Sequence, residues 1–160
     1  MIEEIKTWIL DFVSVHNETI GTVPCPFAKQ AMVVDKIQYT KVDAVTTAST
    51  LIDLIEWDDK YEVVVLYADT NTFTPSELSL LVKQFNLIAM KKDVVALEDH
   101  PLDEEIVNGV HMNFGKAILI LVQRLSKLNN ASKHLDKQGY YDNWSKENYD
   151  DVVSWRTEKP

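Results

Sequence analysis

The sequence predicts a single α/β domain, with a small, mainly parallel sheet of three or four strands packed with helices. Amphipathic helical patterns alternate with short β-prone segments along the chain, an order typical of α/β folds. The run Val63-Val64-Val65-Leu66 is continuously apolar and β-prone, which indicates a strand covered on both faces. With 160 residues, 46% of them hydrophobic, the chain is long enough to build one stable core without a disulfide or a metal.

Each element of the first hundred residues has its own local signal. Ile2, Ile5 and Ile9 recur at helical spacing near the N-terminus. Thr74 is followed by Pro75 and Glu77, so a helix with a capping box is expected to begin there. The remaining segments follow the same helical, alternating or continuous apolar patterns. The predicted helices cover residues 2–17, 26–33, 48–57 and 75–90, and the predicted strands cover residues 37–42, 61–68 and 93–98.

The later part of the chain allows more than one interpretation. Residues 102–115 are polar and irregular, and loops of this length are often functional or mobile. Apolar residues from Ile118 to Leu135 then recur at spacings of three and four, which predicts a long helix ended by Gly139. Taken alone, residues 117–123 also fit a strand, and the pattern leaves both structures open.

Two regions follow from this pattern. Residues 1–139 are expected to form the α/β domain. Residues 140–160 are acidic and rich in tyrosine and tryptophan, and we expect them to form a C-terminal extension that packs on the same domain through its aromatic side chains.

Composition excludes several classes of function. The chain has 25 Asp and Glu against 16 Lys and Arg, a net charge of −9, and no basic cluster that would attract nucleic acid. One cysteine cannot form an intramolecular disulfide, and no apolar run approaches the roughly 20 residues of a membrane span. Acidic residues stand near the start, where a signal peptide carries basic ones. These features predict a cytoplasmic protein with no nucleic-acid or membrane partner, and no cofactor is expected.

The segment around Cys25 is the strongest candidate for chemistry. Pro24 and Pro26 flank the cysteine just before a predicted helix, so backbone N–H groups of that helix would favour the thiolate and lower the thiol pKa below about 8.5. Lys29, one turn into the helix, would add positive potential. The alternative is a structural cysteine, since free cysteine is among the most buried residue types.

His100 is the second candidate catalytic residue. It follows a predicted strand, where sites in α/β folds often lie, and would act as a base to Cys25, with Asp99 orienting its ring. Arg124 is a candidate anion-binding residue, although an ion pair with an acidic neighbour is the simpler interpretation. A solvated acidic loop also explains the residues around His100 better than a hard-metal site, so no metal site is predicted. The acidic residues concerned are Glu98, Asp99, Asp103 and Glu104.

The segment Ile20-Gly21-Thr22-Val23-Pro24-Cys25-Pro26-Phe27-Ala28 resembles an uncharacterised bacterial protein family, a domain of unknown function. In that family an Ile-Gly pair and a Cys-Pro-Phe-Ala element follow a helix containing a tryptophan, here Trp8. A later His-Pro pair is matched by His100-Pro101. Phe114-Gly115-Lys116 stands where the family has a proline-containing stretch. The resemblance covers roughly residues 8–135 and implies no activity, because the family has none assigned.

The family pattern also has an asparagine-rich connection into an arginine-bearing apolar segment. Asn108, Asn113 and Arg124 look similar to it. Together with the Cys-Pro-Phe-Ala element, this resemblance favours placing Cys25 and His100 in one site.

Two hypotheses about function follow. In the first, the domain binds or acts on a small molecule in a pocket that contains Cys25 and His100, and its activity depends on the thiol. In the second, the chain is a non-catalytic interaction module that binds a protein partner through its acidic surface and aromatic tail.

Overall fold

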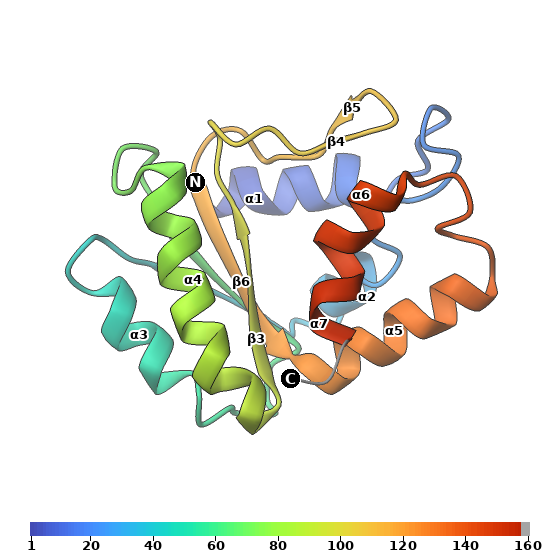
Figure 1. Cartoon of the computed structure of the whole chain (residues 1–160). Coiled ribbons are helices and arrows are strands. Elements are labelled where there is room, and N and C mark those ends of the chain that lie inside the picture. The colour runs from blue at the N-terminus through green and yellow to red at the C-terminus, as the bar shows by residue number, and fades with distance from the viewer. Residues whose placement is uncertain (158–160) are drawn as a thin grey trace.

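The computed structural model describes residues 1–157, and a four-stranded sheet forms its centre (Figure 1). The strand order is β1-β2-β6-β3, with β1 and β2 parallel and β6 antiparallel to both of its neighbours. The fold class is therefore the predicted one. The strands are β1 (Ile37–Lys41), β2 (Val63–Ala68), β3 (Val94–Asp99) and β6 (Ile118–Arg124).

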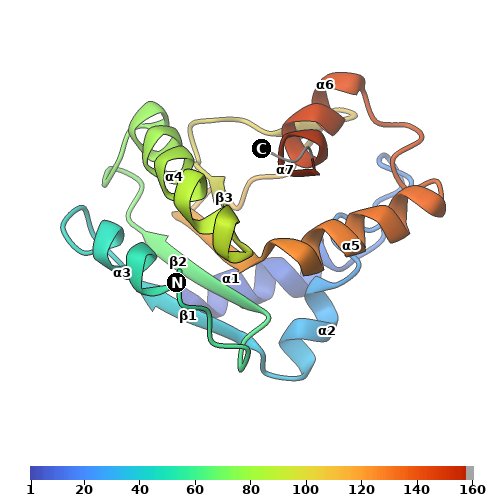
Figure 2. The ribbon, with the colours of Figure 1, turned by 60° about the horizontal axis from the view of Figure 1, so that its bottom comes forward.

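Helices cover both faces of the sheet (Figures 1 and 2). On one face α3 (Thr47–Asp53) and α4 (Pro75–Ala89) bury Leu51 and Leu78 against β2, β3 and β6. On the other face α1 (Ile2–Trp8), a π-helical continuation η1 (Ile9–Val13) and α2 (Ala28–Val33) pack against the opposite sides of the strands. Successive side chains of β2 point into these two cores in turn. Both faces of the strand are therefore buried, which explains its continuous apolar run.

Local signals placed most elements correctly. The expected capping box at the start of α4 is present: Thr74 Oγ1 accepts from the Glu77 N–H at 3.3 Å, and the Glu77 carboxylate accepts from the Thr74 N–H at 2.8 Å. A short helix η2 (Met90–Lys92) ends α4 at Asp93, which adopts a left-handed φ of 60°.

The long helix predicted to begin at Ile118 is wrong for its first seven residues, which form β6. The helix α5 (Leu125–Lys137) begins only after them. Pairing with strands on both sides overrode the helical spacing, because a short apolar run fits either structure in isolation. The expectation of a mainly parallel sheet consequently fits only in part. β1, β2 and β3 run in the same direction, but β6 lies between β2 and β3 and makes both of those pairs antiparallel.

The C-terminal extension packs on the domain as far as the structure describes it. It contains α6 (Lys146–Tyr149), a π-helical turn η3 (Asp150–Ser154) and α7 (Trp155–Thr157). Arg156 is 3% exposed and donates to Asn129 Oδ1 at 2.6 Å and to Ser132 Oγ at 2.8 Å on α5. The extension is therefore held by buried polar contacts as well as by aromatic packing. None of the helices in residues 1–157 is long and apolar enough to cross a membrane.

Candidate functional site

Cys25 lies in a loop that the C-terminal extension holds in place. Its N–H donates to the Val13 carbonyl oxygen at 2.8 Å. The hydroxyl group of Tyr140 lies 2.8 Å from the carbonyl oxygen of Val23 and 2.6 Å from that of Pro24. A segment near the N-terminus and the start of the C-terminal extension thus meet beside the cysteine, which the sequence did not indicate.

The environment of the Cys25 thiol opposes the predicted thiolate. The expected N–H donors are present, since Phe27 and Ala28 at the start of α2 both hydrogen-bond the sulfur and lower its pKa. Burial of the group is the larger effect, however, and the net result is a pKa raised above the ordinary value. This direction is opposite to the predicted one, because the effect of burial on the thiol pKa is larger than that of the two backbone hydrogen bonds, although Cys25 as a whole is only half-buried.

His100 is fixed by hydrogen bonds at both ring nitrogens. Nδ1 accepts from the Leu102 N–H at 3.0 Å, so the proton resides on Nε2, which donates to the Phe73 carbonyl oxygen at 2.9 Å. The residue is 3% exposed. A ring whose only acceptor nitrogen is occupied by a backbone N–H cannot serve as a general base in this conformation.

Asp99 and Asn113 hold the segment that was expected to be an irregular loop. Asp99 accepts from the Asn113 side-chain amide at 3.0 Å and from the Phe114 N–H at 2.9 Å. Asn113 also donates to the Asp103 carbonyl oxygen and accepts from the Glu105 N–H. Burial raises the pKa of Asp99, although both hydrogen bonds oppose the increase. Asp99 therefore orders this segment and does not orient His100.

The same segment contains a small hairpin of β4 (Ile106–Val107) and β5 (Val110–His111). Asn108 and Gly109 at its turn both have positive φ angles, of 51° and 81°, which suit a tight two-residue connection. The long polar stretch is thus a structured cover at one end of the sheet.

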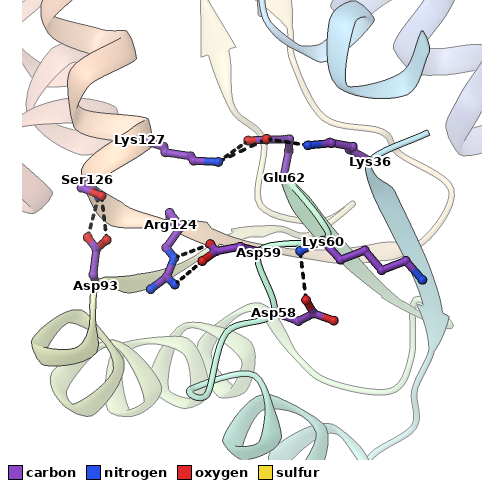
Figure 3. Close-up of polar contacts among 9 residues, drawn as sticks. All are labelled: Lys36, Asp58, Asp59, Lys60, Glu62, Asp93, Arg124, Ser126 and Lys127. Carbon is purple, nitrogen blue, oxygen red and sulfur yellow. Dashed lines mark hydrogen bonds and ion pairs between the residues drawn. The ribbon is translucent and has the colours of Figure 1, made fainter. Parts of the chain in front are cut away.

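Arg124 forms the ion pair that was the simpler interpretation. Its Nε and one terminal nitrogen donate to the two carboxylate oxygens of Asp59 at 3.0 and 3.1 Å (Figure 3). The hydrogen bond from Arg124 lowers the pKa of Asp59. This pair occupies the Nε edge of the guanidinium, so an anion that needs this bidentate edge has to displace Asp59.

A second set of contacts lies beside this pair. Glu62 contacts Lys36 at 3.7 Å and Lys127 at 3.0 Å, and the Asp93 carboxylate accepts from both the N–H and the hydroxyl of Ser126 (Figure 3). Arg124, at the N-cap position of α5, makes no side-chain capping bond. Asp93, from a different part of the chain, accepts from an N–H of the first turn in its place. The contacts join the start of α5 to the sheet.

The structure does not bring the five predicted site residues together. Cys25 contacts the segments around Val13 and Tyr140, whereas His100 contacts Phe73 and Leu102, and no hydrogen-bond partner is shared. Lys29 is exposed on α2 and forms no ion pair within residues 1–157. Within residues 1–157 no hydrogen bond or ion pair links Cys25 to His100, and the catalytic pocket that contains both stays a prediction.

The edge of the sheet at β1 is open. The Val42 N–H donates to the Tyr67 carbonyl oxygen, and the Lys36 carbonyl oxygen accepts from the Glu62 N–H, so the even-numbered residues face β2. The N–H and C=O groups of Ile37, Tyr39 and Lys41 consequently point away from the sheet. Figure 2 shows β1 at the margin of the sheet, with β2 as its single neighbouring strand. Within residues 1–157 no hydrogen bond pairs those outward groups.

Two cavities of about 270 Å³ each flank this edge. The α3 cavity lies between α3 and the sheet, with Gln38 and Thr40 on one side. The α1 cavity lies on the opposite face, beside Ile37 and Tyr39. Successive β1 side chains therefore line opposite cavities, as the alternation of a strand requires. In sequence the segment indicated only a half-buried strand, and nothing local showed that one of its edges would stay unpaired.

One residue that lines each cavity has a buried polar atom without a partner in the described part of the chain. These atoms are the indole nitrogen of Trp57, which lines the α3 cavity, and the hydroxyl oxygen of Tyr39, which lines the α1 cavity. Buried polar groups in folded proteins are nearly always hydrogen-bonded.

The fold and these surfaces define a single α/β domain in which the sheet edge at β1 lies between two cavities. Comparison of the chain with protein-family models, with curated proteins and with solved structures finds no match. The resemblance to an uncharacterised bacterial family therefore stays a prediction.

Proposed function

We propose that this chain is a non-catalytic interaction module that receives an extended segment of a partner protein along β1. The observation that carries the proposal is the row of outward N–H and C=O groups on Ile37, Tyr39 and Lys41. A segment added beside β1 would pair with these groups and direct alternate side chains into the two cavities, the mode of recognition known as strand addition.

The other edge of the sheet supports this interpretation by contrast. The side-chain amide of Asn86 on α4 donates to the carbonyl oxygen of Ala96 on β3 and accepts from the Ala96 N–H. At Ala96 that edge is covered by a side chain of the fold itself, one of the ways in which natural sheets protect an edge strand. Lys41 at the end of β1 is a charged residue of the kind that limits uncontrolled pairing, so the open edge favours a specific partner over aggregation.

The aromatic tail is a weaker candidate for the binding surface. Tyr140, Tyr141 and Trp144 are only partly exposed, and their rings pack against one another at centroid distances of 4.9 to 5.9 Å. Trp155 is 39% exposed and is the most accessible of the tail aromatics in residues 140–157. Most of the tail aromatics therefore contribute to packing.

The thiol-dependent hypothesis has less support. Burial raises the pKa of the Cys25 thiol, and both nitrogens of His100 are engaged. A nucleophile at Cys25 would need a base other than His100.

Amide hydrogen exchange followed by NMR tests the proposal. The probe is the peptide acetyl-Thr-Lys-Val-Lys-Thr-Lys-Val-amide, added in excess. The amides of Ile37, Tyr39 and Lys41 should become protected, by at least about tenfold, while Gln38 and Thr40, already paired with β2, should change little. Protection of none of the three outward amides, by this peptide or by its glutamine counterpart, would contradict strand addition.

A substitution on the protein side separates edge pairing from surface adhesion. Lys41→Pro removes an outward N–H. It removes no bond to β2, because the Lys41 N–H points away from that strand, and proline is tolerated at such edge positions. Lys41→Thr is the matched control, since both variants lose the 3.7 Å ion pair with Asp69. Peptide binding should fall at least about tenfold in Lys41→Pro relative to Lys41→Thr. Equal binding by the two variants would argue against the edge as the site.

A further inference from the structure

We propose that the segment received at β1 is basic, and that its Lys or Arg side chains enter the α3 cavity. This inference rests on the proposed function, because it names the class of partner for the same edge. It concerns an extended polypeptide with positive charge at alternate positions.

The charge of the α3 cavity is the first argument. Asp53, Glu56 and Asp58 line it, and none of the three forms an ion pair within residues 1–157. Within residues 1–157 the only hydrogen bond to these three carboxylates is accepted by Asp58, from the Lys60 N–H at 2.9 Å (Figure 3). By contrast, Asp59 and Glu62 on the same connection are both paired with basic side chains. Three uncompensated carboxylates at one opening attract a cation.

The aromatic walls are the second argument. Trp57 and Tyr61 line the cavity beside the acids. The ammonium group of Lys60 already lies 5.2 Å from the centre of the Tyr61 ring, so this wall holds a cation in the free chain. The three carboxylates outnumber that single ammonium group. An incoming Lys or Arg side chain would meet both an aromatic face and unpaired acids.

The shape of the cavity is the third argument. Its inner wall is formed by Val64 and Leu66 of β2, whereas Gln38 and Thr40 stand at the edge strand. An apolar interior with acidic residues around it suits the long aliphatic stem and charged end of Lys or Arg.

A second copy of the chain is a poorer occupant. Pairing two β1 edges would bring the same three acids of each copy toward one another, and each chain carries a net charge of −9. Like charges placed together at an interface oppose association. A basic partner is complementary both to the cavity and to the chain as a whole.

Fluorescence anisotropy with three peptides tests the charge preference at physiological salt. The peptides are Thr-Lys-Val-Lys-Thr-Lys-Val and its counterparts with Gln or Glu in place of every Lys. The lysine peptide should bind at least about tenfold more tightly than the glutamine peptide, and the glutamate peptide should bind weakest. If the glutamine peptide binds as tightly as the lysine peptide and protects the outward amides of β1, strand addition stands and the basic preference is wrong.

Variants locate the preference in the cavity. The triple variant Asp53→Asn, Glu56→Gln, Asp58→Asn should lose about tenfold in affinity for the lysine peptide and little for the glutamine peptide. The matched control removes three acids elsewhere, by Glu18→Gln, Glu104→Gln and Asp136→Asn, all at exposed positions outside both cavities. It should change the affinity less than about threefold. Equal losses in the two triple variants would reduce the effect to net charge and overturn the proposed site.

Two further measurements keep the outcomes separate. Glu56→Gln alone, at an exposed position, should lose about twofold to threefold and supplies the test if the triple variant fails to fold. Sedimentation of the free chain should show a monomer. A dimer that Lys41→Pro dissociates and Lys41→Thr does not would make a second copy the occupant and contradict a basic partner.

Discussion

The side chain of Asn86 takes the place of a neighbouring strand for Ala96. Its amide nitrogen donates to the Ala96 carbonyl oxygen at 3.0 Å, and its amide oxygen accepts from the Ala96 N–H at 2.8 Å. Asn86 is buried on α4, and Ala96 is fully buried on β3. A single side chain thus pairs the outward groups of Ala96 where α4 packs against the edge strand β3, and β1 has no comparable contact among residues 1–157.

Replacing Asn86 with leucine should destabilise the domain. The change keeps the side-chain size but leaves the buried N–H and C=O of Ala96 unpaired, at a cost of about 2–4 kcal/mol. Chemical denaturation followed by circular dichroism measures the loss. Gln84→Leu on the same helix is the control, since Gln84 is exposed. If the free energy of unfolding falls no more than in the control, the N–H and C=O of Ala96 are hydrogen-bonded by water in the variant.

Asn113 is expected to be necessary for the order of residues 102–113. Asn113→Ala removes donors to Asp99 and Asp103 and the acceptor for the Glu105 N–H. The free energy of unfolding of the variant should be lower by about 1–3 kcal/mol. Limited proteolysis should also cut this segment at least about tenfold faster than in the original chain. Asn143→Ala, at an exposed position, controls for loss of an asparagine, and unchanged cleavage would contradict this role.

The Cys25 thiol should react slowly in the folded chain. Because burial raises its pKa, alkylation by iodoacetamide at pH 8 should be at least about tenfold slower than in denaturant, and the pH midpoint should lie above about 8.5. Tyr140→Phe removes the hydroxyl group that contacts the carbonyl groups of Val23 and Pro24, so it should accelerate the reaction. A fast native reaction with a midpoint below about 8.5 would instead favour the thiol-dependent hypothesis.

Arg156 should anchor the C-terminal extension. Arg156→Ala loses the donors to Asn129 and Ser132 and leaves a gap beneath α7, which should cost about 2–3 kcal/mol. Arg156→Lys should recover little of this loss, because an ammonium group cannot reproduce the planar fork of a guanidinium. Thermal unfolding measures both variants, with the exposed Lys137→Ala as control. Full recovery by lysine would reduce the role of Arg156 to its charge.

Glu98 should make stability depend on pH. Burial raises the pKa of this carboxyl, against the opposing effects of a Ser79 hydrogen bond and the charge of Lys83, and one of its oxygens has no partner in residues 1–157. In the unfolded chain the pKa returns to about 4.3. The folded state therefore binds the proton more tightly than the unfolded state. The contribution of Glu98 to the free energy of unfolding is full below about pH 4 and is lost as the pH rises through the pKa of Glu98 in the folded state.

Glu98→Gln removes this titration. The variant should gain free energy of unfolding relative to the original chain at pH 8, and the gain should vanish at about pH 3, where both carry a neutral side chain. Glu104→Gln, on the exposed part of the chain, controls for the loss of one negative charge. A gain that does not vary with pH, or a loss at pH 8, would show that the carboxylate is stabilised in the folded state.

The site was less predictable than the fold for a physical reason. The candidates Cys25, His100 and Arg124 were chosen by residue type and local position, and each has the local feature expected of it: N–H donors at Cys25, the end of a strand at His100, a carboxylate partner at Arg124. Whether a thiol is ionised or an imidazole is free depends on burial and on partners from distant segments. Tyr140 and Phe73, the relevant partners, have no signal that links them to these residues in sequence.

The sequence by itself determined the α/β class, the capping box of α4 and the acidic character of the chain, because composition, hydrophobic period and capping act over a few neighbouring residues. Tertiary structure decided that residues 118–124 are a strand between β2 and β3, since only pairing on both sides distinguishes a buried strand from a helix in so short an apolar run. It also decided that Asn86 pairs Ala96 at one edge of the sheet, while the outward groups of β1 have no partner in residues 1–157. That difference depends on which helix packs beside which strand, a relationship between segments that no local pattern contains.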